Sequence, residues 1–169
     1  MGNKLIKKKT ERNIDVVKKN IRISDTKINS KYKSSFVSEQ VDNPVIYPKN
    51  NKHLICDDAF TNRLVLKKYL VLFGCDVDEA ENGADAIEKI KLNGEYSIIW
   101  MDIKMPKIDG HECTKILRNE MDYKGKIIGL TGYVDDITIK KCYSIGMNNV
   151  IAKPFDSEII EMYVDKNSR

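Results

Sequence analysis

The chain has 169 residues, of which 41% are hydrophobic and 32% are charged, and its formal net charge is +4. This composition is typical of a globular protein, and no run of about 18 apolar residues suits a membrane-spanning helix. We therefore exclude a membrane-spanning protein, and because the N-terminus also lacks the apolar core of a signal peptide, we expect a cytoplasmic one.

Residues 1–50 differ in charge from the rest of the chain. They contain 12 Lys and Arg against 5 Asp and Glu, a net charge of +7, whereas residues 51–169 contain 17 against 20, a net charge of −3. A segment with few large apolar residues cannot bury enough surface to offset its ordering entropy. We therefore predict a basic, largely flexible extension over 1–50, followed by one folded domain over 51–169.

The basic extension suggests two kinds of partner, and the sequence favours neither. Aromatic residues do not interleave with its lysines as they do in nucleic-acid-binding segments, so no nucleic-acid partner is predicted. The start MGNKLIKKK resembles a myristoylation signal, but Ile6 stands where that signal has Ser or Thr. Membrane contact through the extension is therefore not expected.

From residue 52 onward, short apolar runs alternate with helical patterns. The apolar runs predict strands at 53–56, 75–80, 97–101, 127–130 and 149–152. Residues spaced three and four apart predict helices at 62–73, from 82 onward, at 109–119, at 135–145 and at 156–166. Asn82, Asp109 and Asp156 are the predicted N-caps of three of these helices.

This alternation predicts an α/β fold. Right-handed βαβ crossovers give a doubly wound, five-stranded parallel sheet with helices on both faces, and we expect the strand order 2-1-3-4-5. Ligands of such folds bind at the carboxyl ends of the strands. Cys56, Cys75, Cys113 and Cys142 form no C-x-x-C pair, so we expect them to be reduced and structural.

Polar residues follow the ends of four predicted strands. Asp57 and Asp58 follow the first strand, and Asp102 follows the third. Thr131 and Lys153 follow the fourth and fifth strands. All of these positions open on one edge of the predicted sheet, so we expect their side chains to lie close together.

The chemistry of this set points to phosphoryl transfer. Neighbouring carboxylates repel one another, so they either take up a proton or recruit a cation, and an all-oxygen donor set without histidine suits Mg²⁺. The central carboxylate, Asp102, can act as a nucleophile. Lys153 and Thr131 supply donors that can orient a phosphoryl group during in-line transfer.

Four segments together resemble the receiver domain of two-component response regulators. They are CDD at 56–58, MDIKMPKIDG at 101–110, LTG at 130–132 and KPF at 153–155. FTNRLVLKKYLVLFG, followed by AENGADAI, is similar to the receivers of hybrid histidine kinases in particular. The resemblance covers about residues 52–166 and implies the flavodoxin-like receiver fold.

The resemblance also implies a role for each site residue. Asp102 accepts a phosphoryl group from a phosphohistidine of a histidine kinase or a histidine phosphotransfer protein. Asp58, Asp102 and the backbone carbonyl of Lys104 bind Mg²⁺. Asp57 helps through water or by holding Lys153.

Further implications concern the phosphoryl group and the partners. Thr131 and Lys153 contact the phosphoryl oxygens, and the Lys153–Pro154 peptide bond is cis. A downstream protein is expected to bind the surface formed by residues 135–145, the strand at 149–152 and the last helix, and a homodimer is an option. With no output domain after residue 169, we expect a stand-alone receiver, a relay intermediate or output through the basic extension.

Three positions bear on how the switch would differ from the family pattern. Val150 stands where a Tyr or Phe usually lies, three residues before the lysine, so we expect a small activation change or one that uses another residue. Lys104 and Tyr133 stand where side chains look down on the phosphoryl group. A cation and a bulky ring at these positions predict slow autodephosphorylation, relative to a variant with small residues at both.

Three alternative functions compete with the receiver. A receiver-like scaffold that binds partners without phosphorylation rests only on Val150 and the extension. A phosphatase of the haloacid-dehalogenase type requires an Asp two residues after the nucleophile, where Lys104 stands. Flavin binding requires a Ser/Thr/Gly-rich loop after the first strand, and DDAFTNR is acidic instead.

Overall fold

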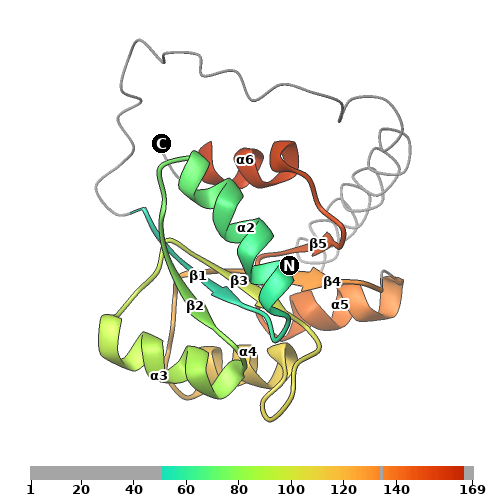
Figure 1. Ribbon diagram of the computed structural model, residues 1–169. Coiled ribbons are helices and arrows are strands. Elements are labelled where there is room, and N and C mark those ends of the chain that lie inside the picture. The colour runs from blue at the N-terminus through green and yellow to red at the C-terminus, as the bar shows by residue number, and fades with distance from the viewer. Residues whose placement is uncertain (1–50, 134, 166–169) are drawn as a thin grey trace, which may run out of the picture.

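Five strands and five helices alternate along the part of the chain that the computed structural model describes, residues 51–133 and 135–165 (Figure 1). The elements are β1 (Lys52–Cys56), α2 (Phe60–Leu72), β2 (Asp76–Ala80), α3 (Gly83–Asn93), β3 (Ile98–Asp102), α4 (Gly110–Asn119), β4 (Lys126–Thr131), α5 (Asp136–Ser144), β5 (Asn149–Ala152) and α6 (Ser157–Asp165). The predicted extension at 1–50 and the end of the last predicted helix lie outside the described residues.

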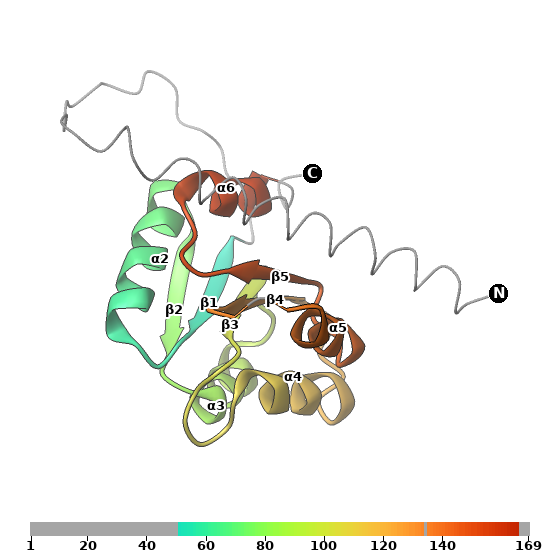
Figure 2. The ribbon, with the colours of Figure 1, turned by 90° about the vertical axis from the view of Figure 1, so that its right-hand side faces the viewer.

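The strands form one parallel sheet in the order β2-β1-β3-β4-β5, which confirms the predicted topology. Helices α2 and α6 cover one face, and α3, α4 and α5 cover the other (Figure 2). The direction in which successive strands are added reverses between β1 and β3, and in open α/β sheets ligands bind beside the carboxyl ends of the strands at such a point. None of the described helices has the length and apolar character needed to cross a bilayer.

Apolar side chains on both faces explain why the central strand is an unbroken apolar run. Ile98 and Trp100 of β3 pack under α2 and α6, whereas Ile99 and Met101 pack under α3, α4 and α5. All four are fully buried. Strand β3 is therefore packed between two apolar layers. This packing fixes the position of its last residue, Asp102, at the carboxyl edge of the sheet.

Side-chain caps set several of the helix starts as predicted. The amide N–H groups of Ala84 and Asp85 donate to Asn82, and that of Glu112 donates to Asp109. The N–H of Ile159 donates to Asp156 at the start of the last helix. All four cysteines are buried and unpaired.

Helix α2 is the exception to this capping rule. It begins at Phe60 rather than at the predicted residue 62, and its N-cap residue, Ala59, has no side-chain cap. Asp57 replaces a cap, because its Oδ1 accepts from the Ala59 N–H at 2.9 Å and from Asn62 Nδ2 at 3.1 Å. The start of α2 is thus tied to the end of β1 by a site carboxylate.

His53 is a buried imidazole in β1. Its Nδ1 accepts from the indole N–H of Trp100 at 3.1 Å, and its Nε2 lies 3.1 Å from Asn51 Oδ1. Burial lowers the pKa of His53 from 6.5 to about 4, because removal from water disfavours the charged imidazolium. The neutral ring with its proton on Nε2 satisfies both contacts.

The free energy of unfolding is expected to rise with pH between about 4 and 6.5 through His53. In this window the unfolded chain binds a proton at His53 that the folded protein does not, so the contribution is about 1 kcal/mol per pH unit. Urea unfolding of the wild type and of His53→Gln across this range measures the difference in slope. Equal slopes for the two proteins would contradict the assignment.

Candidate functional site

Asp57 is the most buried carboxylate at the carboxyl edge of the sheet, with 1% of its surface exposed. In addition to the two donors at the start of α2, its Oδ2 accepts from Lys153 Nζ at 2.5 Å. Asn62 Nδ2 also lies 3.2 Å from the same oxygen. These donors offset the cost of burying the charge and fix the orientation of the carboxylate.

Asp102 lies beside Asp57, at the end of β3. Its Oδ2 is 3.0 Å from Lys153 Nζ, and its Oδ1 accepts from the Lys104 N–H at 3.4 Å. Burial raises the pKa of Asp102 above its ordinary value, Lys153 opposes this rise and the charge of Asp57 adds to it. A single ammonium, that of Lys153, therefore stabilises the negative charge of Asp102, and it only partly offsets the cost of burying that charge.

The loop after Asp102 is folded tightly back onto it. Gly110, the first residue of α4, lies against the backbone carbonyl of Asp102, and any Cβ at this position would overlap that carbonyl. The N–H of Gly110 donates to the carbonyl of Ile103 at 3.0 Å. Glycine at this position is therefore what allows the loop to close beside the carboxylate.

The three aspartates form a cluster with an excess of negative charge. Carboxylate oxygens of Asp57, Asp58 and Asp102 all lie within 4.8 Å of one another, and Asp58 is the exposed member. One ammonium, Lys153, opposes three carboxylates, so the set carries a formal charge of −2. The all-oxygen donors and the uncompensated charge fit a hard divalent cation such as Mg²⁺. It is the one such group of His, Cys, Asp or Glu in the described part of the chain.

Thr131 lies at the same edge, at the end of β4, and is 5% exposed. Its hydroxyl does not contact the aspartates: it donates to the carbonyl of Tyr133 at 2.8 Å and accepts from the Tyr133 N–H at 3.1 Å. The Tyr133 ring and the Lys104 side chain are both exposed. Their predicted effect on dephosphorylation stays a prediction.

Val150 is buried on the other side of β5, in the core beneath α3, α4 and α5. It therefore offers no side chain at the surface that Thr131 could displace. The Lys153–Pro154 peptide bond that follows β5 is cis, as predicted. This bond lies directly after the strand end that carries the ammonium.

The sequence interpretation missed two residues of α2 that complete the site. Asn62 contacts both carboxylate oxygens of Asp57, and Arg63 contacts the backbone carbonyl of the same residue. The signal was available: both residues follow the acidic pair by four to six positions, within the first helical turn. Their side chains therefore point back toward the strand end from which the chain has come.

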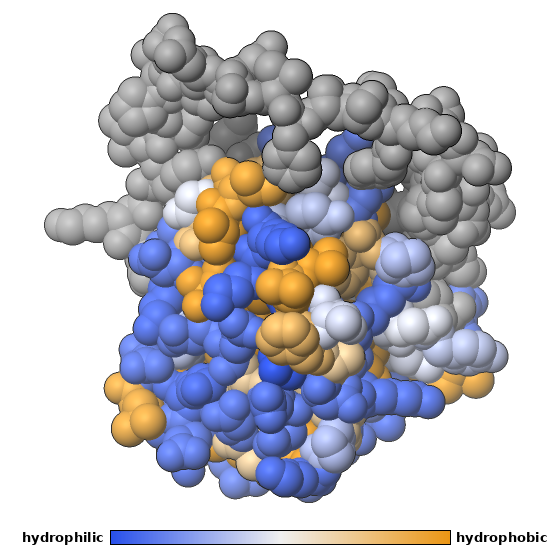
Figure 3. Space-filling view, in the orientation of Figure 1, coloured by the Kyte–Doolittle hydropathy of each residue, from blue (hydrophilic) through white to orange (hydrophobic). Residues whose placement is uncertain are grey.

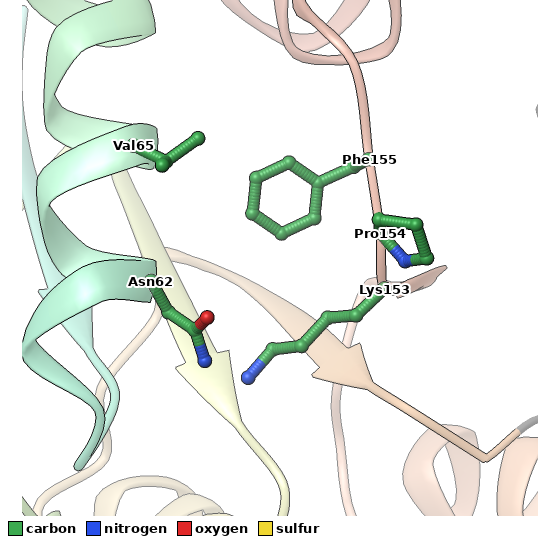
Figure 4. Close-up of a pocket in the computed structure, with 5 residues that line it drawn as sticks. All are labelled: Asn62, Val65, Lys153, Pro154 and Phe155. Atoms are coloured by element: carbon green, nitrogen blue, oxygen red, sulfur yellow. The ribbon is translucent and has the colours of Figure 1, made fainter. Parts of the chain in front are cut away.

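A cavity of about 360 Å³ opens beside the cluster, between α2 and the segment after β5. Its lining is mostly apolar and consists of Asn62, Val65, Lys153, Pro154 and Phe155. Figure 4 shows the Lys153 ammonium pointing toward Asn62, while Val65 and Phe155 face each other across the cavity. The polar site thus borders directly on an apolar recess.

Comparisons with known proteins agree with this geometry. Residues 54–165 match the family described as the response regulator receiver domain. The osmosensing histidine protein kinase SLN1 of Saccharomyces cerevisiae is 39% identical over 108 residues, which cover 61% of this chain and 9% of the kinase. The sensor protein EvgS of Escherichia coli is 35% identical over 130 residues, which cover 77% of this chain and 11% of that protein. The chain thus spans about a tenth of these curated relatives.

Among solved structures, a two-component response regulator from Clostridium difficile is 29% identical, with a TM-score of 0.65. The likeness covers 70% of this chain and 95% of that one.

Proposed function

Because this chain belongs to the response regulator receiver domain family, we propose that Asp102 accepts a phosphoryl group from a phosphohistidine in a two-component phosphorelay. The observation that carries the proposal is the cluster itself: three carboxylates within 4.8 Å, with Lys153 Nζ 3.0 Å from Asp102. Asp58, Asp102 and the backbone carbonyl of Lys104 would bind Mg²⁺, and Asp57 would act through water or by holding Lys153. The bound ion would neutralise charge on the phosphoryl oxygens.

In the transfer step, a carboxylate oxygen of Asp102 attacks phosphorus and the nitrogen–phosphorus bond of the donor histidine breaks. The electron pair of that bond returns to the donor imidazole. Lys153, already paired with Asp102, is placed to follow the incoming phosphoryl oxygens and stabilise their charge. Asn62 and the Ala59 N–H keep Asp57 in place while the ammonium shifts.

Thr131 supplies the connection between the site and the surface. A hydroxyl has one proton, so Thr131 cannot donate to a phosphoryl oxygen while it donates to the carbonyl of Tyr133. Transfer would therefore break the hydrogen bond from Thr131 to the Tyr133 carbonyl, which lies on the path from β4 to α5. We expect the downstream partner to bind the α5–β5–α6 surface, and this route to it does not need an aromatic residue at position 150.

Incubation with acetyl phosphate and Mg²⁺ tests the function. Intact mass spectrometry is expected to show a gain of one phosphoryl group, and the gain is expected to disappear when EDTA removes the metal. An unchanged mass in the presence of Mg²⁺, with a known receiver domain labelled in parallel, would overturn the proposal.

An exposed apolar strip on α2 supports a docked protein donor. Phe60, Leu64 and Val65 are 64%, 40% and 44% exposed, and they lie at the end of α2 that adjoins the site. Figure 3 shows hydrophobic residues gathered over the part of the molecule where α2 lies. A donor histidine must reach Asp102, so the donor protein has to cover the adjoining surface, which includes this apolar strip.

Leu64→Glu is expected to slow transfer from a phosphorylated histidine phosphotransfer protein by about tenfold or more, because a charge would be desolvated in the contact. Labelling by acetyl phosphate is expected to stay within about twofold of the wild type, since a small donor needs no docking surface. Leu72→Glu is the matched control: Leu72 is an exposed leucine at the far end of the same helix. Equal slowing by both variants would contradict the assigned surface.

A further inference from the structure

Arg63 is a cation almost completely buried beneath the acidic cluster. It lies in the first turn of α2 and is 6% exposed. Its Nη1 donates to the backbone carbonyl of Asp57 at 2.9 Å and lies 3.4 Å from that of Asp58. One guanidinium nitrogen therefore contacts both peptide units that carry the acidic pair.

The rest of the guanidinium is anchored on β2 and on the residue directly after it. Nε lies 3.3 Å from Glu79 Oε2, and Nη2 lies 2.9 Å from Glu81 Oε1. Glu79 pairs with Ile55 across the sheet and also accepts from Lys67 Nζ at 2.6 Å. The planar, rigid fork of an arginine can make contacts in three directions at once, which the single ammonium of a lysine cannot.

We propose that Arg63, anchored by Glu79 and Glu81, is a positioning residue that sets the Asp57–Asp58 backbone at the spacing a divalent cation requires. This inference rests on the proposed function, because it concerns the metal affinity of the same site. Asp58 is exposed, so its carboxylate is aimed by its backbone rather than by surrounding side chains. Mg²⁺ tolerates little departure from octahedral geometry, so a small shift of this backbone weakens binding.

Charge and geometry act in opposite directions here and can be separated. A cation beneath the cluster disfavours Mg²⁺ by repulsion, so loss of the charge alone would tighten binding. Arg63→Lys keeps the charge and removes the fork. Weaker Mg²⁺ binding in this variant therefore reports position and not electrostatics.

Arg118 offers a matched control for general loss of stability. It is also a partly buried arginine that donates to backbone carbonyls, those of Gly146 at 3.0 Å and Gly125 at 2.9 Å. These carbonyls precede β5 and β4, at the opposite edge of the sheet from the aspartates. Arg118→Lys therefore removes a similar fork far from the metal site.

The experiment is isothermal titration of MgCl₂ into each metal-free protein, with urea unfolding in EDTA as the stability readout. Arg63→Lys is expected to raise the Mg²⁺ dissociation constant by about tenfold, the usual effect of losing a group that orients metal ligands. Arg118→Lys is expected to leave it within about twofold of the wild type while it lowers the urea midpoint.

Each other result has a distinct meaning. Wild-type affinity in Arg63→Lys would overturn the inference and leave the proposed function intact, and so would an equal loss in Arg118→Lys. Absence of Mg²⁺ binding by the wild type would overturn the proposed function itself. If Arg63→Lys does not fold, Glu81→Ala removes one anchor from an exposed position, and an unchanged dissociation constant in that variant would also refute the role.

Discussion

Asp102→Asn is expected to abolish phosphoryl incorporation from acetyl phosphate, with no mass gain at any Mg²⁺ concentration. The amide is close in size to the carboxylate but lacks a nucleophilic oxygen, so it cannot form the acyl phosphate. The substitution should not damage the fold. Because burial raises the pKa of Asp102, its ionised form is costly in the metal-free protein, and the neutral amide is expected to raise the free energy of unfolding at pH 7.

Asp76→Asn is the matched control for this variant. Asp76 is an exposed aspartate at the start of β2, at the opposite edge of the sheet. The Asp76→Asn variant is expected to gain one phosphoryl group to the same extent as the wild type, and its free energy of unfolding is expected to show no comparable increase. If the Asp102→Asn variant still gains a phosphoryl group, another residue is the acceptor, and the assignment of Asp102 is wrong.

Lys153→Met is expected to slow phosphoryl incorporation by about 100-fold, the usual cost of removing one donor that stabilises charge in the transition state. It is also expected to lower the free energy of unfolding in EDTA by about 2 kcal/mol or more, because Asp57 is left buried without its cation. Added Mg²⁺ should narrow this deficit, since the ion replaces part of the missing positive charge.

Lys67→Met provides the comparison for the loss of stability. Lys67 pairs with Glu79 at 2.6 Å, but the lysine is 43% exposed, so its removal is expected to cost less than about 1 kcal/mol. The double variant Asp57→Asn, Lys153→Met is expected to regain stability relative to Lys153→Met alone. A deficit that is unchanged by both Mg²⁺ and Asp57→Asn would show that the lysine acts through packing and not through its charge.

Much of the fold and the acidic site follows from local patterns in the chain. Apolar runs with helical spacing between them predict the alternation of strands and helices, and the crossover rule turns that alternation into a parallel sheet. Every polar residue directly after a strand must then lie at one edge. Asp57, Asp58, Asp102 and Lys153 were placed together by this reasoning, and the structure places them together.

The position of a residue in the sequence does not specify how a helix is rotated against the sheet or which atoms its side chain contacts. The contacts of Asn62 and Arg63 with the acidic pair and the burial of Val150 depend on those two features. Each is decided by the packing of α2 or β5 against elements distant in sequence.

The sequence by itself therefore determined the alternation of strands and helices and the edge at which the aspartates gather, because both follow from periodicity and chain direction. Only the tertiary structure decided which groups hold those aspartates in place. Hydrogen bonds and ion pairs depend on distances of a few tenths of an ångström, and such distances exist only once the layers have packed.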